Sequence, residues 1–168
     1  MLKIIVTASI SSFIFGFFGV DWKSVDEKIE TEFPDVVFIS TEQLNRQYKD
    51  GGSSLPLIID VREIEEYGVS HLQDALNLQT VESISLRYPD RNEEIIVYCS
   101  VGYRSAKVAS QLQNLGYNNV RNLSHSIFEW ANKGYPLLNE EGGTEKAHPF
   151  NTAWGALLDD PLHSYSQP

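Results

Sequence analysis

The feature of this sequence that most limits its fold is a series of short, mostly apolar runs without the alternation of a half-exposed strand. These runs lie at 36–40, 57–61, 75–78, 95–99 and 120–123. Strands that are apolar along their length are covered on both faces, and sheets of such strands are mostly parallel, with crossover helices between them. The pattern therefore predicts an α/β fold with a central, mostly parallel five-stranded sheet and helices on both faces.

Helices are predicted between these strands. Thr41 is expected to cap a helix over 42–49, and Ser105 to begin a helix that ends at Gly116. A further helix is expected in 126–134. The helix that begins at Ser105 has one apolar face, formed by Val108, Ala109, Leu112 and Leu115.

Charge and cysteine content exclude several kinds of function. The 168-residue chain has a formal net charge of −10, whereas an electrostatic grip on nucleic acid needs clustered Lys and Arg. It has one cysteine, so no disulfide forms within the chain, and its four histidines lack the spacing of metal ligands. We therefore expect no nucleic-acid partner and no metal site.

The first part of the chain differs from the rest. No charged residue occurs from Ile4 to Val20, a length at the lower end of what spans a bilayer. Lys3 before this run and acidic residues after it favour an inside amino terminus and an outside domain, with Trp22 at the membrane surface. We expect residues 4–20 to associate with a membrane as an anchor. A cleaved signal and a hydrophobic element packed on the fold are the alternatives.

The chain is expected to divide into three parts. A hydrophobic segment covers 1–22, one domain covers 36–138, and an extension packed on that domain covers 139–168. Within the extension, a short packed helix is predicted from the spacing of Phe150, Trp154, Leu157 and Leu158. The first segment favours a membrane-anchored or exported protein, with a cytoplasmic location as the alternative.

The stretch CSVGYRS, residues 99–105, joins the end of a predicted buried strand to the start of a helix. Ligands bind beyond the carboxyl ends of strands in such sheets, and a helix start offers unpaired N–H groups and a positive dipole end. Both favour the thiolate of Cys99. Gly102 lets backbone N–H groups turn towards the sulfur, and Arg104 adds a positive charge. The alternative is a buried, unreactive cysteine.

Three separated motifs resemble the rhodanese-like sulfurtransferases, over about residues 36–138. Besides CSVGYRS, they are DVREIEEY (60–67) with SHLQDALNL (70–78), and LGYNNVRNLSHSIFEWANKGYPL (115–137). The sequence departs from the family pattern at Ser70, Asp74 and His125, where the family has glycine. These changes are expected to alter turns and to leave the nucleophile untouched, with His125 on the surface rather than in a pocket.

The resemblance implies a rhodanese-like fold, sulfurtransferase activity and no cofactor. Cys99 would take a sulfane sulfur from thiosulfate or a low-molecular-weight persulfide, become a persulfide, and pass the sulfur to an acceptor such as cyanide or a thiol. The other loop residues would bind the substrate: Ser100, Val101, Gly102, Tyr103, Arg104 and Ser105. Asp60 and Arg62 would brace this loop by charge-assisted hydrogen bonds, with an ordinary solvent-exposed ion pair as the alternative. Because the chain has no second thiol, the sulfur must leave on an external molecule.

Other functions are weighed against this one. Cysteine phosphatases and arsenate reductases have five residues between the cysteine and the arginine of their loop, whereas four separate Cys99 from Arg104 and form a tighter ring. A rhodanese-like binding or regulatory module without turnover is the alternative function, and the retention of Cys99, Gly102 and Arg104 counts against it. Arg104 is the only formal cation of the loop, so a donor less charged than thiosulfate is a serious competitor.

Overall fold

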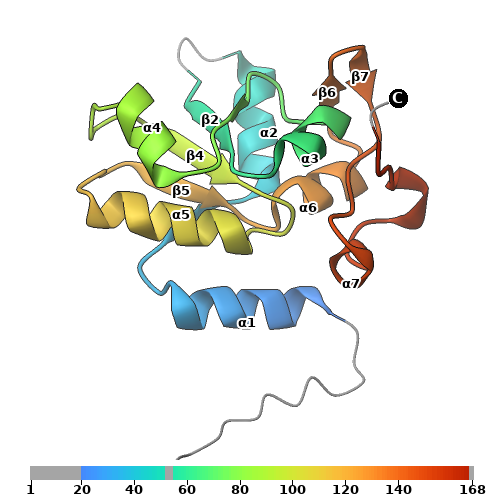
Figure 1. The fold of residues 1–168 in the computed structure, drawn as a ribbon, viewed down its shortest axis with the longest axis horizontal. Coiled ribbons are helices and arrows are strands. Elements are labelled where there is room, and N and C mark those ends of the chain that lie inside the picture. Colours follow the sequence, from blue (N-terminus) through green and yellow to red (C-terminus); the bar gives the residue numbers. More distant parts are fainter. Residues whose placement is uncertain (1–19, 52–54, 167–168) are drawn as a thin grey trace, which may run out of the picture.

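The computed structural model describes residues 20–51 and 55–166. The helices are α1 Trp22–Glu32, α2 Thr41–Asp50, α3 Ile64–Val69, α4 Val81–Arg87, α5 Tyr103–Asn114, α6 Ser126–Asn132 and α7 Thr152–Gly155, followed by a 3-10 turn at Asp160–Leu162. The strands are β1 Val37–Ile39, β2 Leu57–Asp60, β3 Leu76–Asn77, β4 Ile95–Tyr98, β5 Val120–Leu123, β6 Leu137–Asn139 and β7 Gly142–Thr144. Figure 1 shows these elements along the chain.

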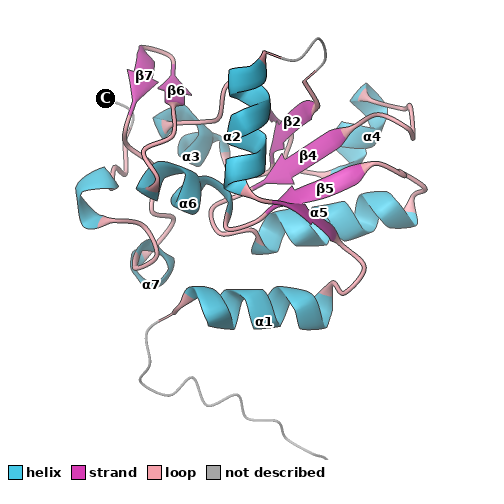
Figure 2. Ribbon diagram, turned by 180° about the vertical axis from the view of Figure 1, so that it is seen from behind, coloured by secondary structure: helices cyan, strands magenta, loops and turns pink. Residues whose placement is uncertain are grey.

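The centre of the molecule is a five-stranded sheet in the order β1-β5-β4-β2-β3, and all four strand pairs are parallel. The predicted five-stranded α/β sheet is therefore confirmed. Along β4, Ile96 and Tyr98 belong to an apolar cluster shared with α2 and α6, whereas Ile95 and Val97 belong to a second cluster shared with α4 and α5. Helices thus cover both faces of the sheet (Figure 2), which is why its strands are apolar throughout.

The starts of two helices differ from the sequence predictions. Ser40, rather than Thr41, caps α2, because its hydroxyl accepts the Gln43 N–H at 3.2 Å. Helix α5 begins at Tyr103 instead of Ser105, because Gly102, with a φ of 100°, turns the chain directly from the strand into the helix.

The apolar face of α5 is also shorter than predicted. Val108, Ala109 and Leu112 are buried, as expected, but Leu115 is 51% exposed. The helix has ended by this residue, and the turn at Gly116 brings Tyr117 into the core instead.

After α6 the chain forms a hairpin, β6–β7, and then an extension that packs back on the domain. Strands β6 and β7 pair antiparallel, and the segment that follows is held at Asn132, which donates to the Leu157 carbonyl and accepts from the Asp159 N–H. Leu157 and Leu158 are buried in the same apolar cluster as α6. The extension therefore lies against the domain, and Figure 1 shows it beside α6.

Helix α1 is an element that the sequence analysis did not predict. It runs beside α5 (Figure 1), and its Val25 and Ile29 side chains are buried in the core. Trp22, which the sequence places at a membrane surface, packs instead on the His125 ring, with 4.4 Å between ring centroids. Residues 4–19 of the expected anchor lie outside the described residues. Among the residues that the structure describes, no helix is long and apolar enough to cross a membrane.

Two of the positions where the family pattern has glycine use left-handed backbone. Asp74 has a φ of 58° and His125 a φ of 54°, whereas Ser70 is extended. Asp is among the residues that tolerate the left-handed region best, and the same holds for His. The substitutions thus keep the backbone turn that glycine would make.

His125 joins α1 to α6. One ring nitrogen, Nδ1, lies 3.0 Å from Glu129, and Nε2 lies 3.0 Å from Asp26 of α1. With its side chain 23% exposed, His125 is not the free surface histidine that the sequence predicts. Hydrogen bonding to Glu129 and to Asp26 raises the pKa of His125 above its ordinary 6.5. Burial alone would raise the pKa of Glu129, but hydrogen bonds from His125 and other donors lower it to about 2.

We expect the contacts of His125 with Glu129 and Asp26 to make folding stability fall both at low pH and at high pH. The contribution of Glu129 is complete above pH 4.5 and is lost as the pH falls towards 2. The contribution of His125 is complete below pH 6.5 and is lost as the pH rises through its raised pKa. Replacing His125 by Asn, which tolerates the same backbone, should remove about 1 kcal/mol near pH 5.5 and much less near pH 9. Urea unfolding at both pH values measures this, and an equal loss at both would contradict it.

Candidate active site

Cys99 follows the carboxyl end of β4, the middle strand of the sheet. Its side chain is 1% exposed. The start of α6 fixes the backbone around it, because Cys99 N–H donates to the Ser126 hydroxyl at 3.1 Å, and Ile127 N–H donates to the Cys99 carbonyl. The nucleophile candidate is thus held between the starts of α5 and α6, at the edge of the sheet where α/β folds bind ligands.

Two donors point at the sulfur of Cys99. Gly102 N–H lies 3.2 Å from Sγ, and the Ser105 hydroxyl lies 3.4 Å from it. The carbonyl of Gly102 accepts from Asn122 Nδ2 at 2.9 Å and lies 3.2 Å from the Ser105 hydroxyl, so this carbonyl and Sγ are alternative acceptors for the one hydroxyl proton. A residue with a Cβ would be strained at the φ of 100° that this arrangement requires. The loop therefore places hydrogen-bond donors where they stabilise negative charge on sulfur.

Behind the loop lies a buried carboxylate that the sequence analysis quoted within a motif but did not assign a role. Both Glu66 oxygens accept from the Arg104 guanidinium at 2.8 Å, and Oε1 also accepts from the Ser100 hydroxyl at 2.9 Å. Arg104 Nη2 donates to the Ser100 hydroxyl as well. Burial raises the pKa of Glu66, but the hydrogen bonds and charge of Arg104, together with the charge of Arg62 and the hydroxyl of Ser100, outweigh it, and the net shift is downward. Glu66 is therefore ionised and fixes the loop by a two-pronged pair.

Asp60 and Arg62 form an ion pair that is entirely buried, with both side chains 0% exposed. The alternative of a solvent-exposed pair is therefore wrong. Arg62 Nη2 donates to Asp60 at 2.6 Å and to the Ser70 carbonyl at 2.6 Å. Among the described residues, no hydrogen bond joins this pair to residues 99–105. Its bracing of the loop stays a prediction, and its direct effect is to hold the end of β2 to the segment after α3.

The loop residues do not all face the sulfur. Val101 is buried in the apolar core. Tyr103 turns towards α1, where its hydroxyl donates to Glu32 at 2.5 Å and Lys28 lies 4.9 Å from the ring centroid. Gly102 and Ser105 contact Sγ, whereas Ser100 and Arg104 bind Glu66. The structure thus separates the predicted binding loop into a polar part and an anchoring part.

The extension contributes a side chain next to this loop. The Arg104 guanidinium carbon lies 4.6 Å from the centroid of the Phe150 ring. From the sequence, Phe150 is expected only to pack on the domain, because the spacing of apolar residues in the extension does not indicate which part of the domain the extension covers. The sequence signal for Glu66 is its place in the motif DVREIEEY, as an acidic residue in the first turn of α3.

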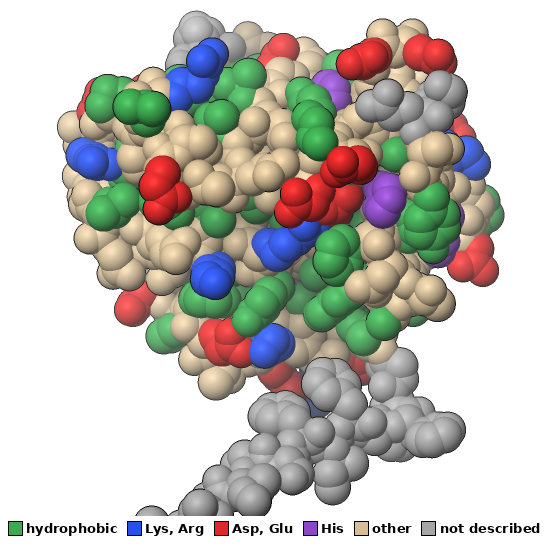
Figure 3. Space-filling model, viewed as in Figure 1, with side chains coloured by type: hydrophobic (Ala, Val, Ile, Leu, Met, Phe, Trp, Pro, Cys, Tyr) green, Lys and Arg blue, Asp and Glu red, His purple; other side chains and the backbone are tan. Residues whose placement is uncertain are grey.

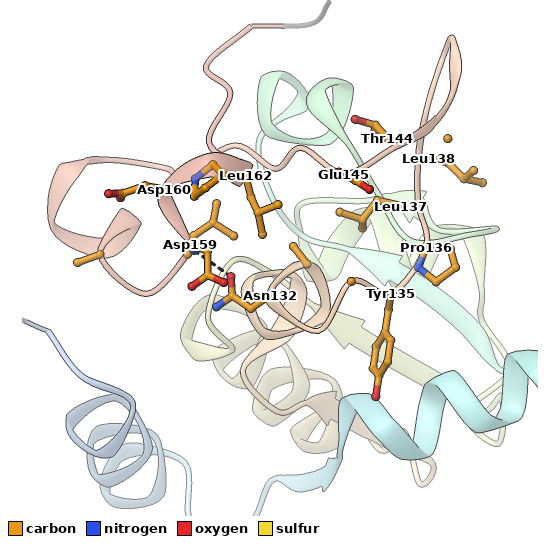
Figure 4. A pocket seen from close by; sticks show the side chains of 16 residues that line it. Asn132, Tyr135, Pro136, Leu137, Leu138, Thr144, Glu145, Asp159, Asp160 and Leu162 are labelled. Carbon is orange, nitrogen blue, oxygen red and sulfur yellow. Dashed lines mark hydrogen bonds between the residues drawn. The ribbon is translucent and has the colours of Figure 1, made fainter.

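A hollow lies on another part of the molecule, and residues 99–105 do not line it. It has a volume of about 1030 Å³ and lies between the end of α6, the β6–β7 hairpin and the 3-10 turn (Figure 4). Its walls include Tyr135, Leu137 and Leu162, and none of the predicted site residues lines it. Without a thiol or a histidine in its lining, this hollow lacks the nucleophile that the loop supplies.

Residues 40–133 match the sequence model of the family described as Rhodanese-like domain. The chain belongs to the rhodanese-like domain family. A sulfurtransferase of Allochromatium vinosum is 30% identical over 106 residues, which cover 62% of this chain and 96% of that protein. A thiosulfate sulfurtransferase, PspE, of Escherichia coli is 37% identical over 67 residues, which cover 38% of this chain and 64% of that protein.

More distant similarities agree with the fold. The tRNA uridine(34) hydroxylase of Buchnera aphidicola is 24% identical over 140 residues, which cover 77% of this chain but only 41% of that protein. The crystal structure of a rhodanese-related protein from Thermoplasma volcanium superposes with a TM-score of 0.52 at 24% identity, over 62% of this chain and 99% of that one. The rhodanese-like fold is thus shown, and the family has sulfurtransferases among its members.

The buried pair gives a stability prediction. Replacing Asp60 by Ala leaves the buried Arg62 charge without its carboxylate partner, and we expect this to cost about 3 to 5 kcal/mol of unfolding free energy. Glu27→Ala is the matched control, because it breaks an ion pair with Lys23 whose side chains are 66% and 82% exposed. That change should cost less than about 1 kcal/mol. Urea unfolding compares the two, and similar losses would contradict the role given to Asp60.

Proposed function

We propose that the protein is a rhodanese-type sulfurtransferase that carries sulfur on Cys99. The Cys99 thiolate attacks the sulfane sulfur of thiosulfate, a new S–S bond forms, and sulfite leaves with the electrons of the broken S–S bond. An acceptor such as cyanide then attacks the outer sulfur of the persulfide. Thiocyanate leaves, and the electron pair of the second S–S bond returns to Cys99 as thiolate. A low-molecular-weight persulfide serves as donor by the same displacement, with a thiolate as leaving group.

The observation that carries this proposal is the pair of donors on Sγ. The Gly102 N–H and the Ser105 hydroxyl, at 3.2 and 3.4 Å, support a sulfur anion at the start of α5, a helix of 12 residues. The same donors suit both the thiolate before transfer and the return of charge to Cys99 afterwards.

The absence of a second cysteine supports a transfer that ends outside the chain. Cys99 is the only cysteine in the sequence, so a persulfide formed on it cannot collapse into an internal disulfide. An external nucleophile is therefore required to complete each cycle.

The central test is the mass of the protein after reaction with a donor. Intact protein incubated with thiosulfate or glutathione persulfide should gain about 32 Da, one sulfur atom, and lose it when cyanide is added. Cys99→Ser should show no gain, because the serine hydroxyl is not ionised by the same donors. The melting temperature serves as the control for folding. A folded wild-type protein that gains no sulfur from either donor would contradict the proposal and favour a binding module.

A second variant tests the cradle of the sulfur. Ser105→Ala removes the hydroxyl next to Sγ, and we expect the rate of persulfide formation to fall about tenfold or more. Ser110→Ala, on the same helix α5, is the matched control and should keep the wild-type rate. Stopped-flow or quenched mass measurements give both rates. Equal rates in the two variants would show that the Ser105 hydroxyl does not assist the sulfur.

A further inference from the structure

The turn that carries Phe150 is tightly built. Phe150 has a φ of 64°, a backbone conformation that costs energy for a residue with a Cβ. Its N–H donates to His148 Nδ1 at 3.0 Å, and Asn151 next to it caps α7 by accepting the N–H groups of Ala153 and Trp154 at 3.0 Å. These contacts fix the backbone of the turn that places the Phe150 ring over Arg104.

Arg104 has two of its five N–H groups left for an anionic substrate, because Glu66 and Ser100 accept the other three. Its two terminal nitrogens already donate to both oxygens of Glu66, and one of them also donates to Ser100. The Phe150 ring covers one face of the guanidinium at 4.6 Å. The only cation of the loop is therefore neutralised by a carboxylate and shielded by an aromatic ring.

The surroundings of this pair do not replace the missing positive charge. Glu63, which immediately precedes the neighbouring α3, and Glu65 within it are exposed, and Figure 3 shows acidic side chains gathered in this region. On the side of the extension stands His148, whose pKa is lowered chiefly by burial, so that the ring is neutral near pH 7. A dianion that approaches from the side of α3 or of the extension meets acidic side chains and a neutral ring.

We propose that Phe150 determines which sulfur donor the site accepts, by shielding Arg104 and presenting an apolar wall that favours organic persulfides over thiosulfate. This proposal rests on the proposed sulfur transfer and specifies its donor class. The sulfonate end of thiosulfate needs charged donors that are free to bind it, whereas the organic part of a persulfide gains from contact with an aromatic face.

The transfer from such a donor is balanced within the site. Cys99 thiolate attacks the outer sulfur of R–S–S⁻, the bond between the two donor sulfurs breaks, and R–S⁻ leaves with its electrons. The protein keeps Cys–S–S⁻, so charge is conserved, and the reaction needs no oxidant or reductant.

Phe150→Ala tests the proposal in the full-length protein, with thiosulfate and glutathione persulfide as the two donors. We expect kcat/KM for thiosulfate divided by kcat/KM for glutathione persulfide to rise about tenfold, mostly through KM, because the exposed Arg104 then meets the dianion. Phe150→Tyr keeps the ring and should restore the wild-type ratio. Phe38→Ala is the matched control, since Phe38 is 39% exposed and Phe150 is 40% exposed, and it should leave the ratio unchanged.

The outcomes separate this proposal from the one on which it depends. If wild-type Cys99 gains no sulfur from either donor, the proposed function fails, and the donor preference fails with it. If Cys99 is loaded but Phe150→Ala leaves the donor ratio unchanged, or lowers both reactions equally, only the role of Phe150 is overturned. Phe150→Asn, which tolerates the left-handed backbone and removes the ring, should raise the ratio in the same way if the alanine variant is unstable.

Discussion

The arrangement around Cys99 depends on one buried carboxylate. Glu66, 2% exposed, accepts two N–H groups of Arg104 and the hydroxyl of Ser100, and its Oε2 also accepts the Glu63 N–H at 3.2 Å. It thereby joins the start of α3 to both ends of the loop. A buried charge is stable only when it is fully paired, so the position of Arg104 is tied to that of Glu66. Arg104 therefore serves first to hold the loop in place. The side chains around it determine how far a substrate can reach its charge.

The terminal segments flank this loop on two sides. Helix α1 receives the Tyr103 hydroxyl at Glu32 and the His125 ring at Asp26, while the extension places Phe150 on Arg104. The segments matched by the family lie between these two, at residues 40–133. The segment matched by the family model therefore supplies the sulfur cradle, and the parts outside it supply further contacts to the loop.

The sequence predicts the core well because burial on both faces leaves a direct mark. Runs such as 57–59 and 95–98 are continuously apolar, and the glycine at 102 marks the turn from strand to helix. Helix α1 was missed because only Val25 and Ile29 of its 11 residues are buried, too few to stand out beside the apolar run that precedes it. Glu66 and Phe150 act through contacts with residues 38 and 46 positions away, respectively, along the chain, which local patterns do not record. The Asp60–Arg62 pair was recognised, but its complete burial is a property of the packed fold alone.

The strand order has a consequence for how the chain acquires its structure. The first strand, β1, pairs only with β5, so that Val37 lies opposite Arg121, and the edge of the sheet stays open until residues 120–123 have been synthesised. The backbone on either side of Cys99 is held by Asn122 and Ser126, which come later still than α5. Contacts between distant residues form slowly, since the intervening chain must first be ordered. On the ribosome, the thiol therefore emerges before the residues that position it, and the sulfur cradle is completed only after nearly the whole domain has been translated.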